Sequence, residues 1–245
     1  MKECSKSIAR RLADSNFTRH YFVGNGVDIG GKPDPLALYQ ELFCQVKSMR
    51  TWDWEDGDAQ VMSGVPDSHF DFVHSSHCLE HLVDPLAGLR TWLRVVRSGG
   101  YLVITVPDED LYEQGIFPST FNRDHKWTFT TFKTSSWSQR SINVVDMIRD
   151  LGERAELIRL EQLNSTYRFE LPRYDQTLSP VGECGIEFVI RKRTPEEIAD
   201  RGRWRRGAHQ PVREVRVHLN QHRDDLQTLK KNNEGRPPFT NDSDL

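Results

Sequence analysis

Two glycines and three carboxylates in the first quarter of the chain have types and spacings that could bind a small molecule. Asp28 lies in the short apolar segment 27–29, which runs directly into Gly30 and Gly31. A strand that ends in glycines exposes backbone N–H groups and lets a ligand approach the main chain closely. The sequence KPDP follows, and its two prolines remove N–H donors that a phosphate cradle would need. The turn therefore favours a ligand without phosphates.

The other two carboxylates follow at the ends of predicted strands. Asp53 lies near the end of the predicted strand 46–54, where it could accept hydrogen bonds from both hydroxyls of a ribose. Asp58 and Ala59 fall in a predicted short strand at 57–62, where the carboxylate could accept the exocyclic amine of an adenine. A turn or cap role is the alternative for each acid taken singly. Their order along the chain favours a nucleoside site.

Histidine supplies the candidate general bases, because its side chain gains or loses a proton near neutral pH. His77 follows a predicted buried strand that turns at Ser75 and Ser76, and His125 lies in the long loop that comes later. The alternatives are a place in the pocket wall for His77 and a contact to Asp124 or to backbone for His125. Either histidine could be the base.

The predicted loop 108–140 is rich in aromatic and polar residues and shows little periodicity, which is typical of a functional loop. Aromatic faces and carboxylates suit a polyhydroxylated substrate. The candidate substrate-binding residues of this loop are Tyr112, Glu113, Asn122, Asp124 and Trp127. The chain has no HExxH motif and no paired histidine–carboxylate spacing, so the sequence predicts no bound metal.

Strands, glycine turns and helices alternate along the chain, which predicts an α/β fold with a parallel sheet and crossover helices. The clearest helix is predicted at 84–100, and the apolar run 101–107 follows as a buried strand. A second helix is predicted at 141–153, with Ser141 as its N-cap. A late strand at 183–193 is expected to pair antiparallel with the strand before it.

The composition indicates a globular chain that does not span a membrane. The net charge of −3 over 245 residues gives no argument for nucleic acid or an anionic membrane as partner. The four cysteines form no CxxC pair, which favours free thiols in a reducing compartment. The N-terminus lacks the apolar core of a signal peptide, and no apolar run approaches the roughly 20 residues of a bilayer span. A cytoplasmic location is therefore expected.

Four segments of the chain read VDIGG, GDAQVM, FDFVHSSHCLEHLVDP and RSGGYLVITVPD. In this order and spacing they resemble the class I S-adenosylmethionine-dependent methyltransferases, in the branch that carries LEH after the fourth strand. The resemblance covers about residues 20–193. It implies a Rossmann-like methyltransferase sandwich, with a mostly parallel seven-stranded sheet whose last strand is antiparallel. The family pattern Asp-x-Gly-x-Gly-x-Gly is kept here only as Asp28, Gly30 and a shifted Gly31.

The resemblance also implies S-adenosyl-L-methionine as cofactor and a role for each site residue. The glycines would lie against its methionine and ribose, and Asp28 would organise the loop or reach the amino group. Asp53 would bind the ribose hydroxyls, and the turn at Ser75 would line the methionine end. His81, in the LEH tripeptide, is interpreted as structural. The implied cofactor-binding residues are Asp28, Gly30, Gly31, Asp53, Asp58, Ala59, Ser75 and Ser76.

The predicted function is methyl transfer to a hydroxyl of a small polar acceptor, most plausibly a sugar or glycan precursor. The segment DLYEQGIFPSTFNRDHKWTFT supports this, because it is similar to one in methyltransferases of surface-polysaccharide and sugar-modifying clusters. One alternative is N-methylation of an amino-sugar or another small metabolite. The other alternative is a non-catalytic, cofactor-binding partner subunit.

Composition changes after residue 193, which predicts a methyltransferase domain at 1–193 and a helical, partly disordered extension at 194–245. Apolar residues repeat in a heptad-like stripe between 212 and 229. The stripe predicts either an amphipathic helix that lies on its own domain or a contact in a homodimer or with a partner protein. The residues of the stripe are Val212, Val215, Leu219, His222, Leu226 and Leu229.

Overall fold

The computed structural model describes residues 3–203 and 226–231. Residues 1–202 and residues 203–245 form two separate compact units. The short helix α4 (Pro195–Ala199) belongs to the first unit. Most of the stripe predicted at 212–229 lies outside the described residues, and Leu226 and Leu229 are exposed in a helical segment. Within the described ranges, no helix is long and apolar enough to cross a membrane.

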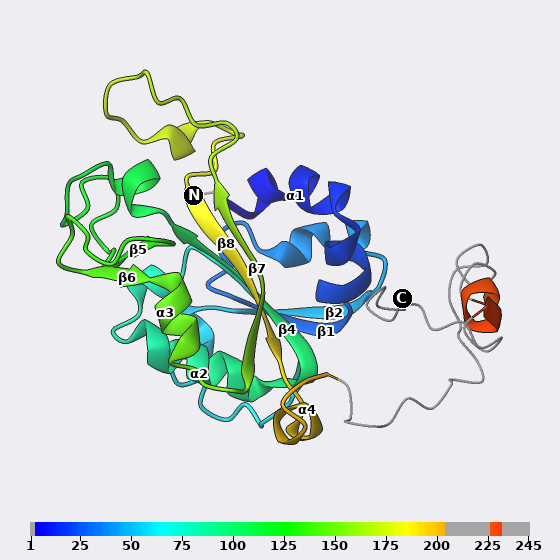
Figure 1. Cartoon of the computed structure of the whole chain (residues 1–245). Helices are drawn as coiled ribbons and strands as arrows, with labels where there is room; N and C mark the ends of the chain where they lie inside the picture. The colour runs from blue at the N-terminus through cyan, green and yellow to red at the C-terminus, as the bar shows by residue number, and fades with distance from the viewer. Residues whose placement is uncertain (1–2, 204–225, 232–245) are drawn as a thin grey trace, which may run out of the picture. The chain divides into compact units, whose positions relative to one another are not determined.

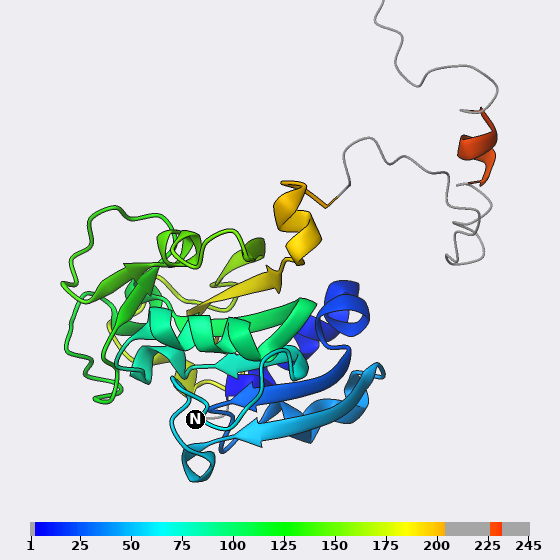
Figure 2. The same ribbon diagram turned by 90° about the horizontal axis from the view of Figure 1, so that it is seen from below.

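A six-stranded sheet forms the centre of the first unit (Figure 1). Its strand order is β2-β1-β3-β4-β8-β7, and Figure 2 shows the same sheet from below. The strands are β1 (Gly24–Ile29), β2 (Val46–Trp52), β3 (Phe70–Ser76), β4 (Val96–Pro107), β7 (Ala155–Leu163) and β8 (Gly185–Lys192). The first four strands are parallel to one another, and β8 is antiparallel to both β4 and β7. The prediction of a mostly parallel sheet whose last strand in sequence is antiparallel is confirmed.

The prediction of seven strands is wrong, because residues 57–62 form turns instead of a strand. Gly57 and Met62 have φ values of 107° and 47°, which an extended strand does not allow. The side chain of Asp58 accepts a hydrogen bond from the N–H of Gln60, an arrangement that stabilises a turn. The turn also buries Met62 in the core, which satisfies its apolar side chain without a strand.

Helices cover both faces of the sheet (Figure 1). One face carries α2 (Pro85–Val95) and α3 (Val144–Arg149). The other carries α1 (Glu3–Ala13), the π-helical turn η1 (Phe17–Tyr21) and the 3-10 helix η2 (Leu36–Leu42). Neighbouring strand residues serve opposite faces, as in β4, where Leu102 and Ile104 pack in one core cluster and Val103 in the other. The remaining 3-10 helices are η3 (Trp54–Asp56), η4 (Leu79–His81) and η6 (Gln176–Leu178).

The helix predicted at 84–100 ends earlier than expected. Asp84 caps α2 and Pro85 occupies its first turn, as the sequence indicates. The helix ends at Val95, however, and β4 begins at Val96, which pairs with Phe70 of β3. Glycine is needed inside this strand, since a Cβ on Gly100 would lie 2.4 Å from the carbonyl oxygen of Asp71. Gly100 therefore permits close strand contact, and α2 ends before it is reached.

The segment 108–140 contains ordered structure that its sequence does not reveal. It begins with the π-helical turn η5 (Glu109–Glu113) and includes β5 (Thr128–Thr130), which pairs in parallel with β6 (Ser141–Asn143). The buried carboxylate of Glu109 accepts hydrogen bonds from Thr128, Lys133 and Ser141 and so joins both strands to η5. Asn143, not Ser141, is the N-cap of α3, so the helix predicted at 141–153 is shorter at both ends.

Candidate active site

Two adjoining cavities open at the carboxyl ends of β1, β2 and β3. The smaller has a volume of about 190 Å³ and the larger about 970 Å³. The chain leaves β1 toward β2 on one side and returns to β3 on the other, which is where ligands bind in open α/β sheets. The residues that line both cavities are Gly30, Lys32, His77, His81 and Asn122. The two cavities therefore form one connected site.

The larger cavity brings together the predicted nucleoside-binding residues Asp53, Asp58 and Ala59. Asp53 follows β2, where its carboxylate accepts hydrogen bonds from the N–H of Trp54 at 2.9 Å and of Lys32 at 3.1 Å. A carboxylate has about four acceptor positions, so Asp53 retains capacity for two further donors such as a ribose diol. Asp58 is exposed and uses one oxygen to cap its own turn.

The glycine turn after β1 forms the floor between the two cavities. Gly30 has a φ of 70°, and a Cβ there would lie 2.7 Å from the Cβ and Sγ of Cys78. A Cβ on Gly31 would lie 2.4 Å from a carboxylate oxygen of Asp28. Only glycine fits either position. The chain then continues through a cis peptide bond at Lys32-Pro33.

Asp28 is fully buried, and its carboxylate organises the loop that follows. Oδ2 accepts a hydrogen bond from the N–H of Leu36 at 2.7 Å, and Oδ1 lies 2.6 Å from Nδ1 of His74. The guanidinium of Arg11 lies 2.9 Å from the other ring nitrogen, Nε2. Since Arg11 can only donate, Nε2 accepts and Nδ1–H donates to Asp28. The contacts of Asp28 thus hold the loop after β1 in place, and Asp28 also lines the smaller cavity.

His74 and Arg11 were not among the sequence candidates. His74 lies inside the apolar strand β3, where a buried polar residue is itself a signal, because it needs a partner. Arg11 lies on α1, far from the glycine turn in sequence. Its guanidinium also forms a fully buried ion pair with Glu187 at 2.8 Å. The nearby guanidinium groups outweigh burial and lower the pKa of Glu187 to about 2.

The two serines of β3 lie in different places because successive strand residues point to opposite sides. Ser76 lines the smaller cavity. Ser75 is fully buried, and its hydroxyl donates to the carbonyl oxygen of Ile29 at 3.0 Å. Ser75 lines neither cavity. Its contact holds β1 and β3 together beside the glycine turn.

His77 lies where the two cavities meet. Its φ of 54° is one that residues other than glycine rarely adopt. Its N–H donates to the carbonyl oxygen of Thr105, which fixes this turn, and its Nδ1 lies 3.2 Å from Oγ of Ser76. The other nitrogen, Nε2, is buried and has no hydrogen-bond partner. Burial lowers the pKa of His77 to about 4, so the imidazole is neutral at neutral pH.

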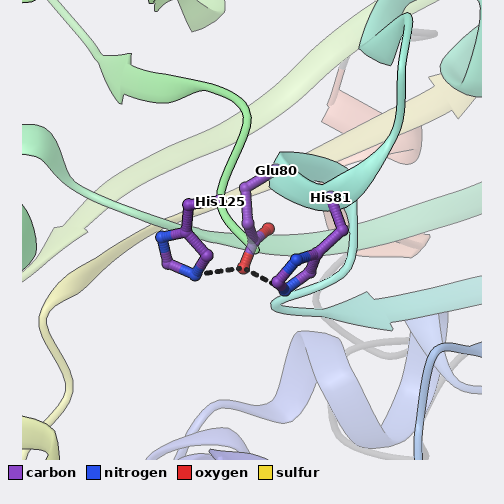
Figure 3. A group of neighbouring side chains, drawn as sticks. All are labelled: Glu80, His81 and His125. Carbon is purple, nitrogen blue, oxygen red and sulfur yellow. Dashed lines mark ion pairs between the residues drawn. The ribbon is translucent and has the colours of Figure 1, made fainter. Parts of the chain in front are cut away.

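His125 reaches the smaller cavity from the 108–140 segment and is held by carboxylates. Its Nδ1 donates to Oε1 of Glu113 at 2.7 Å, and its Nε2 lies 3.8 Å from Oε1 of Glu80. Figure 3 shows Glu80 between the rings of His125 and His81. Burial would lower the pKa of His125, but the bond to Glu113 and the charge of Glu80 outweigh burial and raise it.

The other predicted substrate residues are distributed around the site. Tyr112 and Asn122 line the smaller cavity, and Asp124 lines the larger one. The Tyr112 hydroxyl is buried without a partner, and burial raises the pKa of this phenol. Trp127 lines neither cavity, because its ring packs on the main core and its indole N–H donates to the carbonyl oxygen of Leu82. Trp127 therefore anchors the loop instead of contacting a ligand.

A mixed α/β sheet with its ligand cavities at the carboxyl ends of parallel strands defines a Rossmann-like protein. The sequence of residues 14–165 matches the model of a family described as Methyltransferase domain. This match spans more than half of the chain, so the protein belongs to that methyltransferase family. Among curated proteins, no sequence matches this chain.

Several solved structures are similar to this chain. A candidate methyltransferase from Bacillus halodurans C-125 superposes with a TM-score of 0.50 at 16% identity, over 76% of this chain and 99% of that one. An S-adenosylmethionine-dependent methyltransferase from Archaeoglobus fulgidus gives 0.49 at 16% identity, over 78% and 95%. Phosphoethanolamine N-methyltransferase 2 of Haemonchus contortus, solved with S-adenosyl-L-methionine, gives 0.46 at 13%, over 76% and 53%. At these identities the likeness concerns the fold alone.

The protein is therefore an S-adenosylmethionine-dependent methyltransferase, and the larger cavity fits that cofactor. A ribose diol and an adenine amine supply the hydrogen-bond donors for which Asp53 and Asp58 retain acceptor positions. Gly30 and Gly31 leave room for a ligand to approach the main chain. Bound there, the cofactor supplies a methyl group on a positively charged sulfur, ready for direct transfer to a nucleophile.

Proposed function

We propose that the protein methylates a hydroxyl of a small polar acceptor, such as a sugar or glycan precursor. One observation carries the proposal. In the part of the chain that the structure describes, the buried side-chain atoms without a hydrogen-bond partner belong to His77 and Tyr112, which line the smaller cavity, and to Glu80 and Glu113, which lie against His125 in its wall. Buried polar groups without partners are costly, so this grouping favours a ligand that brings its own hydroxyls. A volume of about 190 Å³ favours a small one.

The neutral His77 is the proposed base. If its Nδ1–H donates to the hydroxyl of Ser76, the lone pair of Nε2 is left to accept a proton from the acceptor hydroxyl. His125 is less suited, because its Nδ1–H already donates to Glu113 and its Nε2 faces a second carboxylate, that of Glu80. His125 and Glu113 would instead orient the acceptor.

N-methylation is the second candidate, and two features favour it. A pKa of about 4 makes His77 a weak base, and a neutral amine needs none. The unpartnered oxygens of Glu80 and Glu113 also suit the N–H groups of an amine. An acceptor amine would replace the hydroxyl without changing where the cofactor binds.

Cofactor binding is tested by isothermal titration of the full chain with S-adenosyl-L-methionine. We expect saturable binding at submillimolar concentration, and Asp53→Ala should weaken it at least tenfold, because a buried ribose diol then loses its acceptor. Asp67→Ala, which removes an exposed carboxylate outside the cavity, is the matched control and should bind normally. Equal affinities of the Asp53→Ala variant and the unmodified protein would rule out this position for the ribose.

The acceptor is identified by incubating fractionated cell extracts with the chain and cofactor that carries an isotopically labelled methyl group. Mass spectrometry of the products should show the label on a sugar or another polyhydroxylated metabolite. Label on an amine nitrogen would select N-methylation instead. No labelled product in any fraction, from a chain that binds the cofactor, would support a non-catalytic partner subunit.

A further inference from the structure

Glu80, His81 and His125 place three metal-binding atoms around one point beside the smaller cavity. Oε1 of Glu80 lies 3.9 Å from Nε2 of His81 and 3.8 Å from Nε2 of His125. All three donor atoms lie within 4.8 Å of one another. Glu80 and His81 come from the short helix η4, and His125 comes from the 108–140 segment (Figure 3).

The hydrogen bonds of the two histidines fix which nitrogen faces Glu80. Nδ1 of His81 donates to the carbonyl oxygen of Asp124 at 3.1 Å, and Nδ1 of His125 donates to Glu113 at 2.7 Å. In the neutral tautomers, each Nε2 therefore presents a lone pair toward the carboxylate. Metal-binding histidines are held in this way, with the second nitrogen donating to a carboxylate or a backbone carbonyl.

The carboxylate of Glu80 is the group in this arrangement that lacks hydrogen bonds. The residue is fully buried, and neither carboxylate oxygen has a hydrogen-bond partner. Burial of an uncharged polar group without a hydrogen-bond partner costs about 2–7 kcal/mol, and burial of an unpaired carboxylate costs more. The distances to both imidazoles exceed those of hydrogen bonds. When both imidazoles are neutral, their two lone pairs and the carboxylate repel one another, and a cation between them removes this repulsion.

The distances and surroundings also fit a metal ion. Ligand atoms about 2.1 Å from a tetrahedral ion lie roughly 3.4 Å apart, so Oε1 of Glu80 needs to approach each histidine nitrogen by about half an ångström. The His125 ring is held from both sides, with its centroid 5.0 Å from that of His81 and 5.1 Å from that of Tyr112. His81 is partly exposed and lines both cavities, which gives an ion a path of entry.

We propose that Glu80, His81 and His125 bind a divalent first-row transition metal ion with an open coordination position toward the smaller cavity. Two imidazoles and one carboxylate favour ions such as Zn²⁺, Co²⁺, Mn²⁺ or Fe²⁺ over Mg²⁺, which prefers oxygen ligands. At the open position, the ion would hold the acceptor hydroxyl and lower its pKa, which relieves the demand on a weak base. This role rests on the proposed function, whereas the binding of the ion does not.

The site is tested with the full chain after treatment with a chelator and removal of that chelator. Titration with CoCl₂ should produce visible absorption bands that saturate at one equivalent, and ZnCl₂ should displace the Co²⁺. An absence of such bands, or absorption that rises without saturation, would overturn the proposal. Separate titrations with S-adenosyl-L-methionine, without metal, report on the cofactor cavity, so failure of one site is distinguished from failure of the other.

Variants locate the ion. Loss of a residue that hydrogen-bonds to a metal ligand weakens metal binding roughly 10- to 100-fold. Because Glu113 accepts such a bond from His125, Glu113→Gln should weaken Co²⁺ binding by about that factor. Glu80→Gln and His81→Ala remove ligands and should weaken Co²⁺ binding further still. His69→Asn changes an exposed histidine outside both cavities and should bind Co²⁺ normally. If Glu80→Gln does not fold, His81→Ala decides, because its side chain is partly exposed; unchanged Co²⁺ affinity in that variant would refute the assignment.

Discussion

His77 combines two unusual properties in one residue: a backbone with positive φ and a buried ring nitrogen without a partner. Strained backbone conformations persist where the surrounding structure holds them, and they occur often at functional sites. The bond from the His77 N–H to Thr105 supplies that hold. The conformation keeps the imidazole at the junction of the two cavities.

Replacement of His77 by asparagine separates its chemical role from its backbone role. Asparagine tolerates positive φ, so His77→Asn should fold normally and bind the cofactor with little change. Turnover of a hydroxyl acceptor should fall about 10²- to 10⁴-fold, the usual contribution of a general base. Titration calorimetry measures cofactor binding and initial rates measure turnover, with His69→Asn as the control. Full turnover in His77→Asn would instead favour an amine acceptor.

Gly30 is a second position where the main chain excludes other residues, and a matched glycine makes this testable. Gly30→Ala places a Cβ 2.7 Å from the Cys78 side chain at a φ of 70°. Gly64 has a similar φ of 79°, but a Cβ there would meet nothing within 4 Å. The Gly64→Ala variant should therefore lose about 1 kcal/mol of unfolding free energy, from the strained backbone alone. The Gly30→Ala variant should lose about 1–3 kcal/mol more, because of the close contact. Urea unfolding measures both, and equal losses would contradict the close packing at Gly30.

At the scale of elements, a chain of buried hydrogen bonds connects helix α1 to the loop after the glycine turn. Arg11 on α1 donates to His74 on β3, which donates to Asp28 on β1, which accepts from the N–H of Leu36. Arg11 is itself fixed by Glu187 of β8. Five elements thus meet in one polar network inside the sheet's core. A buried polar network specifies geometry best when every member has its partner.

The Arg11–Glu187 pair makes stability depend on pH below the neutral range. The folded-state pKa of Glu187, about 2, lies below its ordinary value of 4.5, so folding favours the ionised form. This stabilisation is present above pH 4.5 and is lost as the pH falls from 4.5 toward 2. The free energy of unfolding, measured by urea denaturation, should fall across this interval.

The matched variant is Glu187→Gln, which leaves the charge of Arg11 buried without its partner. At pH 7 it should lose about 3–5 kcal/mol of unfolding free energy. The part of the acid dependence that Glu187 contributes should also be absent from the variant. A variant whose unfolding free energy falls as steeply with acid as that of the unmodified chain would show that other carboxylates cause the loss.

At the scale of the whole molecule, the parts that could be predicted are those with a local pattern. Continuous apolar runs predict the buried strands β4 and β8, and the glycine turn with its following carboxylates predicts the cofactor cavity. Residues 57–62 were mistaken for a strand because their turn depends on backbone angles that the apolar pattern does not report. Alternation along β3 would have distinguished the buried Ser75 from Ser76 at the cavity.

The polar cluster beside the smaller cavity could not be predicted in the same way. Glu80 and His81 are neighbours in sequence, but His125 joins them only because β5, β6 and the buried Glu109 fold the 108–140 segment back over the sheet. Searches for metal motifs use fixed spacings, and this arrangement has none. The signal that remains in sequence is the acid of LEH, Glu80, which lies in the turn η4 after the buried strand β3.

The final prediction concerns the chain after residue 202. Every residue that lines the two cavities belongs to the unit 1–202, as do the hydrophobic core clusters on both faces of the sheet. A chain shortened to residues 1–202 should therefore fold, with a thermal midpoint within a few degrees of the full chain. It should also bind S-adenosyl-L-methionine with an affinity within about threefold, less than the 1.4 kcal/mol that a tenfold change represents. Thermal unfolding and titration calorimetry check both values. A shortened chain that folds but binds the cofactor at least tenfold more weakly would mean that residues 203–245 take part in the site, and the two cavities would then describe only part of it.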